Sequence, residues 1–104
     1  MKIKVGKSYW RVYVVKDIQD ALDAASGCTV RRISKDVVGY TDVQHKVIFL
    51  QKKRSAEQLA STYFHELLHA ACPDLSEKRV YHIERCLFRL LWRDGWRPSC
   101  LYRA

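Results

Sequence analysis

Two histidines and a glutamate are the residues of this chain best suited to chemistry. His65, Glu66 and His69 form an H-E-x-x-H motif inside an apolar run. In a helix, a spacing of four residues puts both imidazoles on one face, where they can bind a single zinc ion. The Glu66 carboxylate would lie beside them, in position to accept a proton from a metal-bound water. The motif therefore indicates the chemistry of a zinc peptidase.

The surrounding sequence predicts the helix that carries the motif. Ser55 and Gln58 have the spacing of a capping box, which begins a helix, and Pro73 ends the apolar run. The apolar residues between them recur at helical spacing: Ala56, Leu59, Ala60, Tyr63, Phe64, Leu67, Leu68 and Ala71. Polar residues on a mostly buried helix need partners, and a metal ion would be one. The alternative is an ordinary amphipathic helix with two surface histidines.

A catalytic zinc usually has three protein ligands, so the motif requires a third. A second helix is predicted from about Leu75 to Arg93. If the two helices form a hairpin that turns near Pro73, Glu77 lies opposite the motif and near the metal. Glu84 then lies beyond it on the same inward stripe, which comprises positions 77, 80, 84, 87 and 91.

Glu77 is favoured as the third ligand, with alternatives. Residues 74–77, D-L-S-E, also fit a capping box in which Glu77 would only bond the Asp74 amide. His82 shares a side with the basic residues of its helix and is expected to face water. Cys72 lies three residues after His69 and could close the site as a thiolate, although a small filler at the helix end suits it better. His82, Glu84 and Cys72 therefore stay open as alternatives.

Length and composition predict one domain spanning residues 1–104, with a motif core at 37–93 and an irregular tail at 94–104. No apolar run approaches a membrane span and the first residues lack a signal-peptide core, so we expect a cytoplasmic protein that does not enter a membrane. The four cysteines form no C-x-x-C pair, and we expect buried or inert thiols.

The formal charge of +8 is high for this length. It favours nucleic acid or another anionic partner, although a solvated face that keeps a small protein soluble is the simpler interpretation. The basic residues form two clusters, one before the motif helix and one along the second helix. They are Lys52, Lys53 and Arg54, and then Lys78, Arg85, Arg89 and Arg93.

The other segments predict an α+β fold, a small antiparallel sheet packed on a helix pair. Alternation predicts a strand over Ser8–Val15, and two more are expected at Val37–Thr41 and Lys46–Gln51. A short strand at Thr29–Ile33 is a further candidate. A short helix is expected at Asp17–Ala25, with Asp17 as its cap and Gly27 as its stop.

The run from Ser61 to Ala71, S-T-Y-F-H-E-L-L-H-A-A, resembles the active-site helix of the ImmA/IrrE-type zinc metallopeptidases. It is most similar to small phage and prophage proteins with a T-x-x-H-E-L-L-H-A pattern. The resemblance covers about residues 37–92 and includes the G-Y-T that begins at Gly39 and the L-S-E that ends at Glu77. It implies a minimal zincin-like metallopeptidase with His65, His69 and Glu77 as zinc ligands and Glu66 as general base. SprT-like peptidases are the second choice, with His82 as their third ligand.

As a peptidase, the chain would hydrolyse a protein or peptide with zinc-activated water. Glu66 would accept the proton of the water and pass it to the leaving amine. Tyr81 is a candidate donor to the oxyanion, although an aromatic packed on the sheet is an equal alternative. The strand at Lys46–Gln51 could pair with an extended substrate.

Two other classes of function stay open. The zinc could act as a structural staple in a small basic module that binds nucleic acid or an acidic protein without catalysis. The chain could also bind no metal at all. A water beside Glu66 in an open coordination sphere would favour hydrolysis over the binding module.

Overall fold

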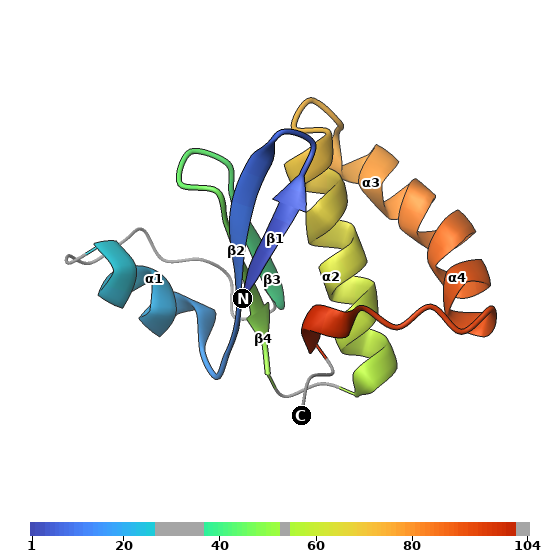
Figure 1. Ribbon diagram of the computed structural model, residues 1–104, viewed down its shortest axis with the longest axis horizontal. Coiled ribbons are helices and arrows are strands. Elements are labelled where there is room, and N and C mark those ends of the chain that lie inside the picture. The colour runs from blue at the N-terminus through green and yellow to red at the C-terminus, as the bar shows by residue number, and fades with distance from the viewer. Residues whose placement is uncertain (27–36, 53–54, 102–104) are drawn as a thin grey trace.

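A four-stranded sheet separates one short helix from a longer set of helices (Figure 1). The structure is a computed structural model that describes residues 1–26, 37–52 and 55–101. The strands are β1 (Lys2–Val5), β2 (Ser8–Val15), β3 (Gly39–Asp42) and β4 (Val47–Gln51). The α+β fold class is confirmed, and β1 is a strand that the sequence did not predict.

The sheet is mixed, so the prediction of an antiparallel sheet is wrong. The strand order is β1-β2-β4-β3, and β2 runs parallel to β4 while the other two pairs are antiparallel. The β3–β4 hairpin places β3 at the edge and β4 inside, because Ile48, Phe49 and Leu50 of β4 are all buried and need cover on both faces. Both edges of β4 are therefore paired, and β4 cannot accept a substrate strand.

The short helix α1 (Ile18–Ser26) covers one face of the sheet. Asp17 caps it as predicted, since the Asp20 amide donates a 3.0 Å hydrogen bond to Asp17 Oδ1. Ile18 and Leu22 of this helix pack on Phe49 of β4. The predicted stop at Gly27 and the predicted strand at Thr29–Ile33 lie outside the described residues.

The motif helix α2 (Ala56–Ala71) covers the opposite face. Its capping box is confirmed: the Gln58 amide donates to Ser55 Oγ at 3.2 Å and the Ser55 amide donates to Gln58 Oε1 at 3.3 Å. Tyr63 and Ala70 of α2 join the main core. The buried sheet residues of that core are Trp10, Val12, Ile48 and Leu50.

The second helical segment is continuous from Glu77 to Arg93 but changes its winding. It consists of α3 (Glu77–Ile83), a π-helical turn η1 (Glu84–Phe88) and α4 (Arg89–Arg93). The wide turn shifts the inward stripe by one residue, so that Phe88 is buried while Leu87 and Leu90 are exposed. The prediction that Leu87 faces inward is therefore wrong, whereas Val80 is buried as predicted.

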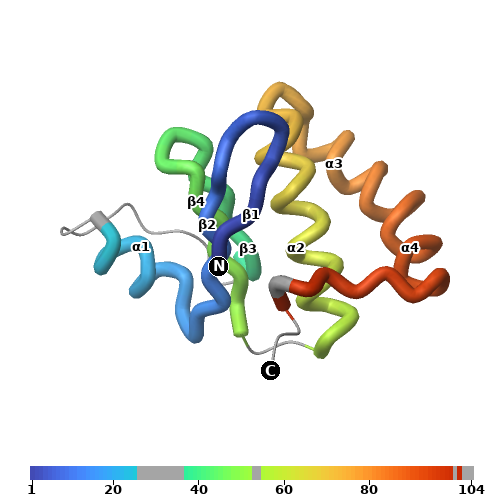
Figure 2. The backbone as a smooth tube through the Cα atoms, viewed as in Figure 1, coloured from blue at the N-terminus to red at the C-terminus, as the bar shows by residue number. Residues whose placement is uncertain are grey.

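The C-terminal tail is more ordered than predicted. It forms a 3₁₀ turn η2 (Ser99–Leu101), and Trp96 and Leu101 pack against the main core. Figure 2 shows this segment running back from α4 toward α2. No helix among the described residues is long and apolar enough to cross a membrane. Cys72 and Cys86 are free thiols, and both are exposed, so of the expected buried or inert thiols these two are not buried.

Candidate metal centre

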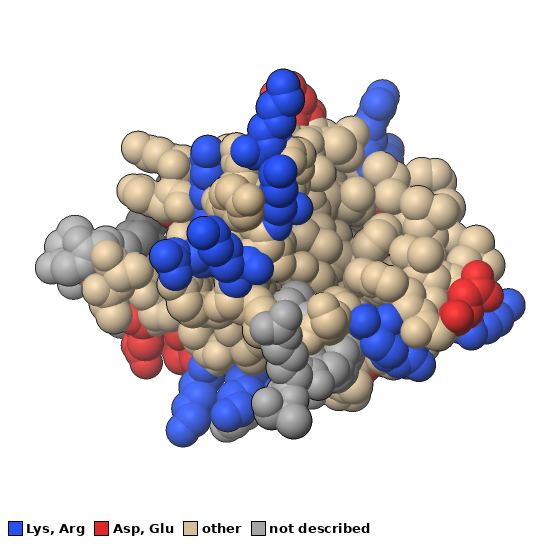
Figure 3. All heavy atoms as spheres, viewed as in Figure 1, with Lys and Arg blue, Asp and Glu red and all other residues tan. Residues whose placement is uncertain are grey.

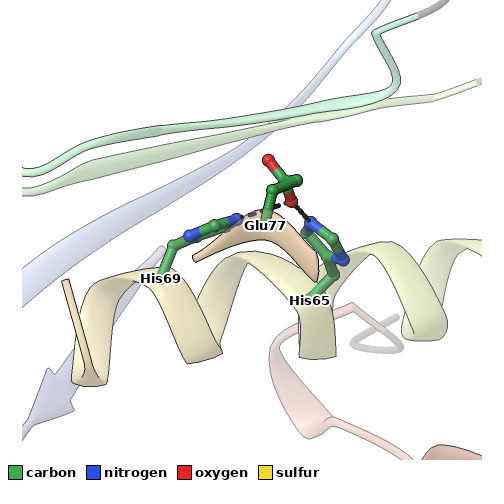
Figure 4. A group of neighbouring side chains, drawn as sticks. All are labelled: His65, His69 and Glu77. Atoms are coloured by element: carbon green, nitrogen blue, oxygen red, sulfur yellow. Dashed lines mark hydrogen bonds and ion pairs between the residues drawn. The ribbon is translucent and has the colours of Figure 1, made fainter. Parts of the chain in front are cut away.

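Three side chains converge at the point where α2 and α3 face each other. His65 Nε2 lies 2.6 Å and His69 Nε2 lies 2.9 Å from the same oxygen, Oε1 of Glu77. Figure 4 shows the Glu77 carboxylate between the two imidazoles. One potential ligand atom from each residue lies within 4.8 Å of the others, so the group can hold a metal ion. Two imidazoles and one carboxylate also form the protein ligand set of one class of catalytic zinc site.

Glu77 can serve this cluster because another residue caps its helix. Ser76 is the N-cap of α3, and its Oγ accepts a 3.2 Å hydrogen bond from the Arg79 amide. The alternative capping box led by Asp74 does not form, since the helix begins at Glu77 rather than at Leu75. The Glu77 side chain therefore turns toward α2, and helix residues 77–81 lie opposite the motif as the hairpin predicts.

Glu84 binds the other side of His65 instead of joining the cluster. Its Oε2 lies 2.9 Å from His65 Nδ1, and its Oε1 accepts a 2.6 Å hydrogen bond from Ser61 Oγ. The π-turn begins at Glu84, where a change of winding aims the carboxylate at α2. A carboxylate on Nδ1 leaves Nε2 free to face a metal and fixes the orientation of the ring. Glu84 thus lies outside the three-residue group and contacts it through His65.

The Glu66 carboxylate contacts the edge strand β3 and lies near enough to His65 and His69 to interact with their charges. Thr41 Oγ1 donates a 2.7 Å hydrogen bond to Glu66 Oε1 and also lies 3.2 Å from its main-chain oxygen. The β3 backbone lies so close that a Cβ on Gly39 would come within 2.8 Å of Glu66 Oε2 and 2.7 Å of Thr62 Cγ2. Glu66 is buried, with 7 % of its surface exposed. Two residues of β3 therefore define the place of this carboxylate.

Burial and neighbouring charges shift the pKa values of the site in different directions. Burial raises the pKa of Glu66, although the Thr41 hydrogen bond and the nearby histidines oppose this. Burial alone would lower the pKa of His65, but its hydrogen bonds to Glu84 and Glu77 and the charge of Glu66 raise it overall. Burial would raise the pKa of Glu77, but hydrogen bonds from His69 and His65 lower it. Such opposed shifts are typical of functional sites.

The other candidates lie outside the cluster. His82 is exposed, as expected, and its Nε2 lies 3.7 Å from Cys86 Sγ. Cys72 is the exposed C-cap of α2. Tyr81 is 53 % exposed and its ring centre lies 4.6 Å from that of His65, so the alternative that Tyr81 packs on the sheet is wrong.

The residues of the two predicted basic clusters lie on different parts of the surface. Lys52 is exposed, while Lys53 and Arg54 lie outside the described residues. Arg85 and Arg89 line a hollow of about 350 Å³ between α2 and the second helical segment, next to Tyr81 and Glu84. Lys78 and Arg93 are exposed.

Sequence reasoning missed Thr41, Ser61 and the contact of Glu84 with His65. Thr41 and Ser61 carry ordinary hydroxyls at unremarkable spacings, and only the packing of β3 and the π-turn on α2 gives them partners. Their one sequence signal was that both lie within the segment that resembles the ImmA/IrrE-type peptidases.

The site therefore combines a three-residue group that can hold a metal, a histidine held by a second carboxylate, and a buried glutamate held by the edge strand. In comparisons with protein-family models, curated proteins and solved structures, the chain has no match.

Proposed function

We propose that this protein is a zinc-dependent metallopeptidase of the ImmA/IrrE type. The observation that carries the proposal is the convergence of His65 Nε2 and His69 Nε2 on Glu77, with the buried Glu66 next to His65 on the same helix. His65, His69 and Glu77 would hold the zinc. When bound there, zinc supplies Lewis acidity, which lowers the pKa of a water and polarises a peptide carbonyl.

Glu66 performs the proton transfers in this proposal. Its carboxylate accepts a proton from the attacking water and later delivers it to the leaving amine. The raised pKa of Glu66, caused first by its burial, suits a group that must both take and release a proton near neutral pH. Thr41 keeps the carboxylate in place by its 2.7 Å hydrogen bond.

An extended substrate would lie along β3. Among the described residues, β3 pairs only with β4, so its other edge is open for an added strand. Gly39 and Thr41 of this strand contact Glu66, so a peptide paired there would pass beside the general base. The proposed strand for substrate pairing is therefore β3 and not β4, the strand that the sequence had suggested for this role.

Tyr81 is the proposed donor to the oxyanion. Its ring lies against His65 and half of its surface is exposed to an incoming substrate. Replacement by Phe should lower kcat and leave KM nearly unchanged, because the hydroxyl would act only as negative charge develops. An unchanged kcat would show that the Tyr81 hydroxyl does not donate to the oxyanion.

The test of the proposed function uses Glu66→Gln in the full chain. The zinc-loaded protein should release labelled fragments from casein, whereas Glu66→Gln should bind zinc and lose at least about 100-fold of that rate. Glu57→Gln, an exposed position on the same helix, is the matched control and should keep the full rate. Equal rates in the two variants would contradict a general-base role, and loss of zinc from Glu66→Gln would show that Glu66 is a ligand.

A further inference from the structure

The sheet face that looks away from α2 carries alternating aromatic and basic side chains. On β2, Trp10 and Val12 point into the core, so Tyr9, Arg11 and Tyr13 point to the opposite face. The register of β1 extends this pattern. Lys2 lies opposite Arg11, and Lys4 lies opposite Tyr9. Five side chains thus share one face of two antiparallel strands, namely Lys2, Lys4, Tyr9, Arg11 and Tyr13, which we call the β1–β2 face.

Both tyrosines of the β1–β2 face are accessible. Tyr9 is 58 % exposed, and Tyr13 is 39 % exposed. The ammonium groups of Lys2 and Lys4 lie 4.6 Å and 5.8 Å from the centre of the Tyr9 ring. The ring of Tyr13 stacks on Phe49 of β4, with 5.8 Å between ring centres. The two tyrosines therefore form an aromatic surface bordered by cations. It adjoins Phe49, on which α1 packs.

The cations of this face have no carboxylate partners in the described part of the chain. Neither Lys2, Lys4 nor Arg11 has a carboxylate oxygen within 4.0 Å there. Figure 3 shows Lys and Arg side chains gathered over the region of β1 and β2.

We propose that the β1–β2 face binds single-stranded nucleic acid. Phosphates would meet Lys2, Lys4 and Arg11, and unpaired bases would stack on Tyr9 and Tyr13. The tyrosines are four residues apart on one strand, about 13 Å, with Arg11 between them. Aromatic side chains in a positively charged track are what sequence-tolerant binding of single strands requires, because every unpaired base offers a face for stacking. In a duplex those base faces are stacked inside the helix and cannot reach the tyrosines. An acidic peptide would pair with the cations but has no bases to stack on the two tyrosines.

This surface is independent of the proposed peptidase site. The motif helix packs on the Trp10 and Val12 face of the sheet, so the β1–β2 face lies on the other side from His65 and Glu66. Failure of either proposal therefore leaves the other standing.

The test measures fluorescence anisotropy of labelled oligo-dT and oligo-U strands of about 20 nucleotides with the full-length protein, over a range of salt. The double variant Tyr9→Leu/Tyr13→Leu should weaken binding roughly tenfold or more, because it removes both stacking faces. Tyr9→Phe/Tyr13→Phe should bind nearly as well as the native chain, because it keeps both rings. Circular dichroism establishes that each variant is folded.

Charge is tested separately with two variants that remove equal charge. Lys2→Gln/Lys4→Gln should weaken binding and reduce the slope with salt, whereas Arg89→Gln/Arg93→Gln on α4 should have a smaller effect. Equal losses in the two charge variants, or equal binding by the Leu and Phe variants, would overturn the proposal. Tighter binding of a duplex, of poly-glutamate or of phosphatidylglycerol vesicles would also overturn it and would assign the face to that partner.

Discussion

Thr41 Oγ1 donates a 2.7 Å hydrogen bond to Oε1 of Glu66, which joins the edge strand to the motif helix. The two residues are 25 positions apart in the chain, and the hydroxyl meets a carboxylate that is almost fully buried. A buried carboxylate without a hydrogen bond is costly, so Thr41 both stabilises the ionised form of Glu66 and fixes its direction.

Replacement of Thr41 by Val should raise the pKa of Glu66 further. The hydrogen bond from Thr41 lowers this pKa and burial raises it. Without the hydrogen bond, the effect of burial therefore raises the pKa further. The acid limb of kcat/KM should then move to higher pH, and kcat should fall by roughly tenfold. Thr41→Ser keeps the hydroxyl and should keep the native profile. An unshifted acid limb in Thr41→Val would show that this limb does not report Glu66.

Replacement of Gly39 by Ala should damage both the fold and the site. The added Cβ would lie 2.7 Å from Thr62 Cγ2 and 2.8 Å from Glu66 Oε2, so β3 or the carboxylate must shift. We expect a loss of about 1–3 kcal/mol in the free energy of unfolding and a large loss of activity.

Gly6→Ala provides the matched control for Gly39→Ala. Gly6 has φ +60, and an added Cβ would meet nothing within 4 Å. This variant should lose roughly 1 kcal/mol of stability from backbone strain and keep its activity. Chemical denaturation gives the stabilities and casein hydrolysis gives the rates. Equal activity losses in both variants would mean that Gly39 acts through stability alone.

The three residues that can hold a metal ion were predictable from the sequence because their convergence depends on local spacing. His65 and His69 are one helical turn apart, and a hairpin of two helices brings Glu77 to them. Glu84 and Phe88 could not be placed correctly, because a uniform 3.6-residue period does not anticipate a π-turn. Nor could the parallel pairing of β2 with β4 be foreseen, since it depends on contacts between segments far apart in the chain.

Replacement of Glu84 by Gln should weaken zinc binding without removing a ligand. The Glu84 carboxylate lies 2.9 Å from His65 Nδ1, and a carboxylate there orients the ring and increases its basicity. We expect zinc affinity to fall by roughly 10–100-fold, as measured by competition with a chromogenic chelator. Ser61→Ala should cause a smaller loss, because it removes only the 2.6 Å bond that anchors Glu84. Glu57→Gln is the exposed control, and an affinity in Glu84→Gln as high as in this control would contradict the positioning role.

The metal-free protein should lose stability as pH rises past neutrality. The pKa of His65 is raised above the ordinary 6.5, so its contribution is fully present below 6.5 and is lost as pH rises through the folded value. The lowered pKa of Glu77 has the opposite sign. Its contribution is present above 4.5 and is lost as pH falls through the folded value. With zinc bound, stability should instead increase with pH in the neutral range, because zinc needs neutral imidazoles and displaces their protons.

Thermal unfolding from about pH 6 to about pH 8, with chelator and with zinc, measures both trends. His82→Gln should keep the metal-free trend and His65→Gln should lose it, because His65 contacts both Glu77 and Glu84 whereas His82 is exposed. A metal-free Tm that rises through this window would contradict the assignment.

We propose that His65, His69 and Glu77 together hold one zinc ion. The most direct test is the zinc content per chain of the native protein, Glu77→Ala and the exposed control Glu57→Ala, after reconstitution and removal of free metal. We predict about one zinc per chain in the native protein and in Glu57→Ala, and a large loss in Glu77→Ala. Native protein without zinc after reconstitution, or Glu77→Ala with a full complement of zinc, would contradict this set of ligands.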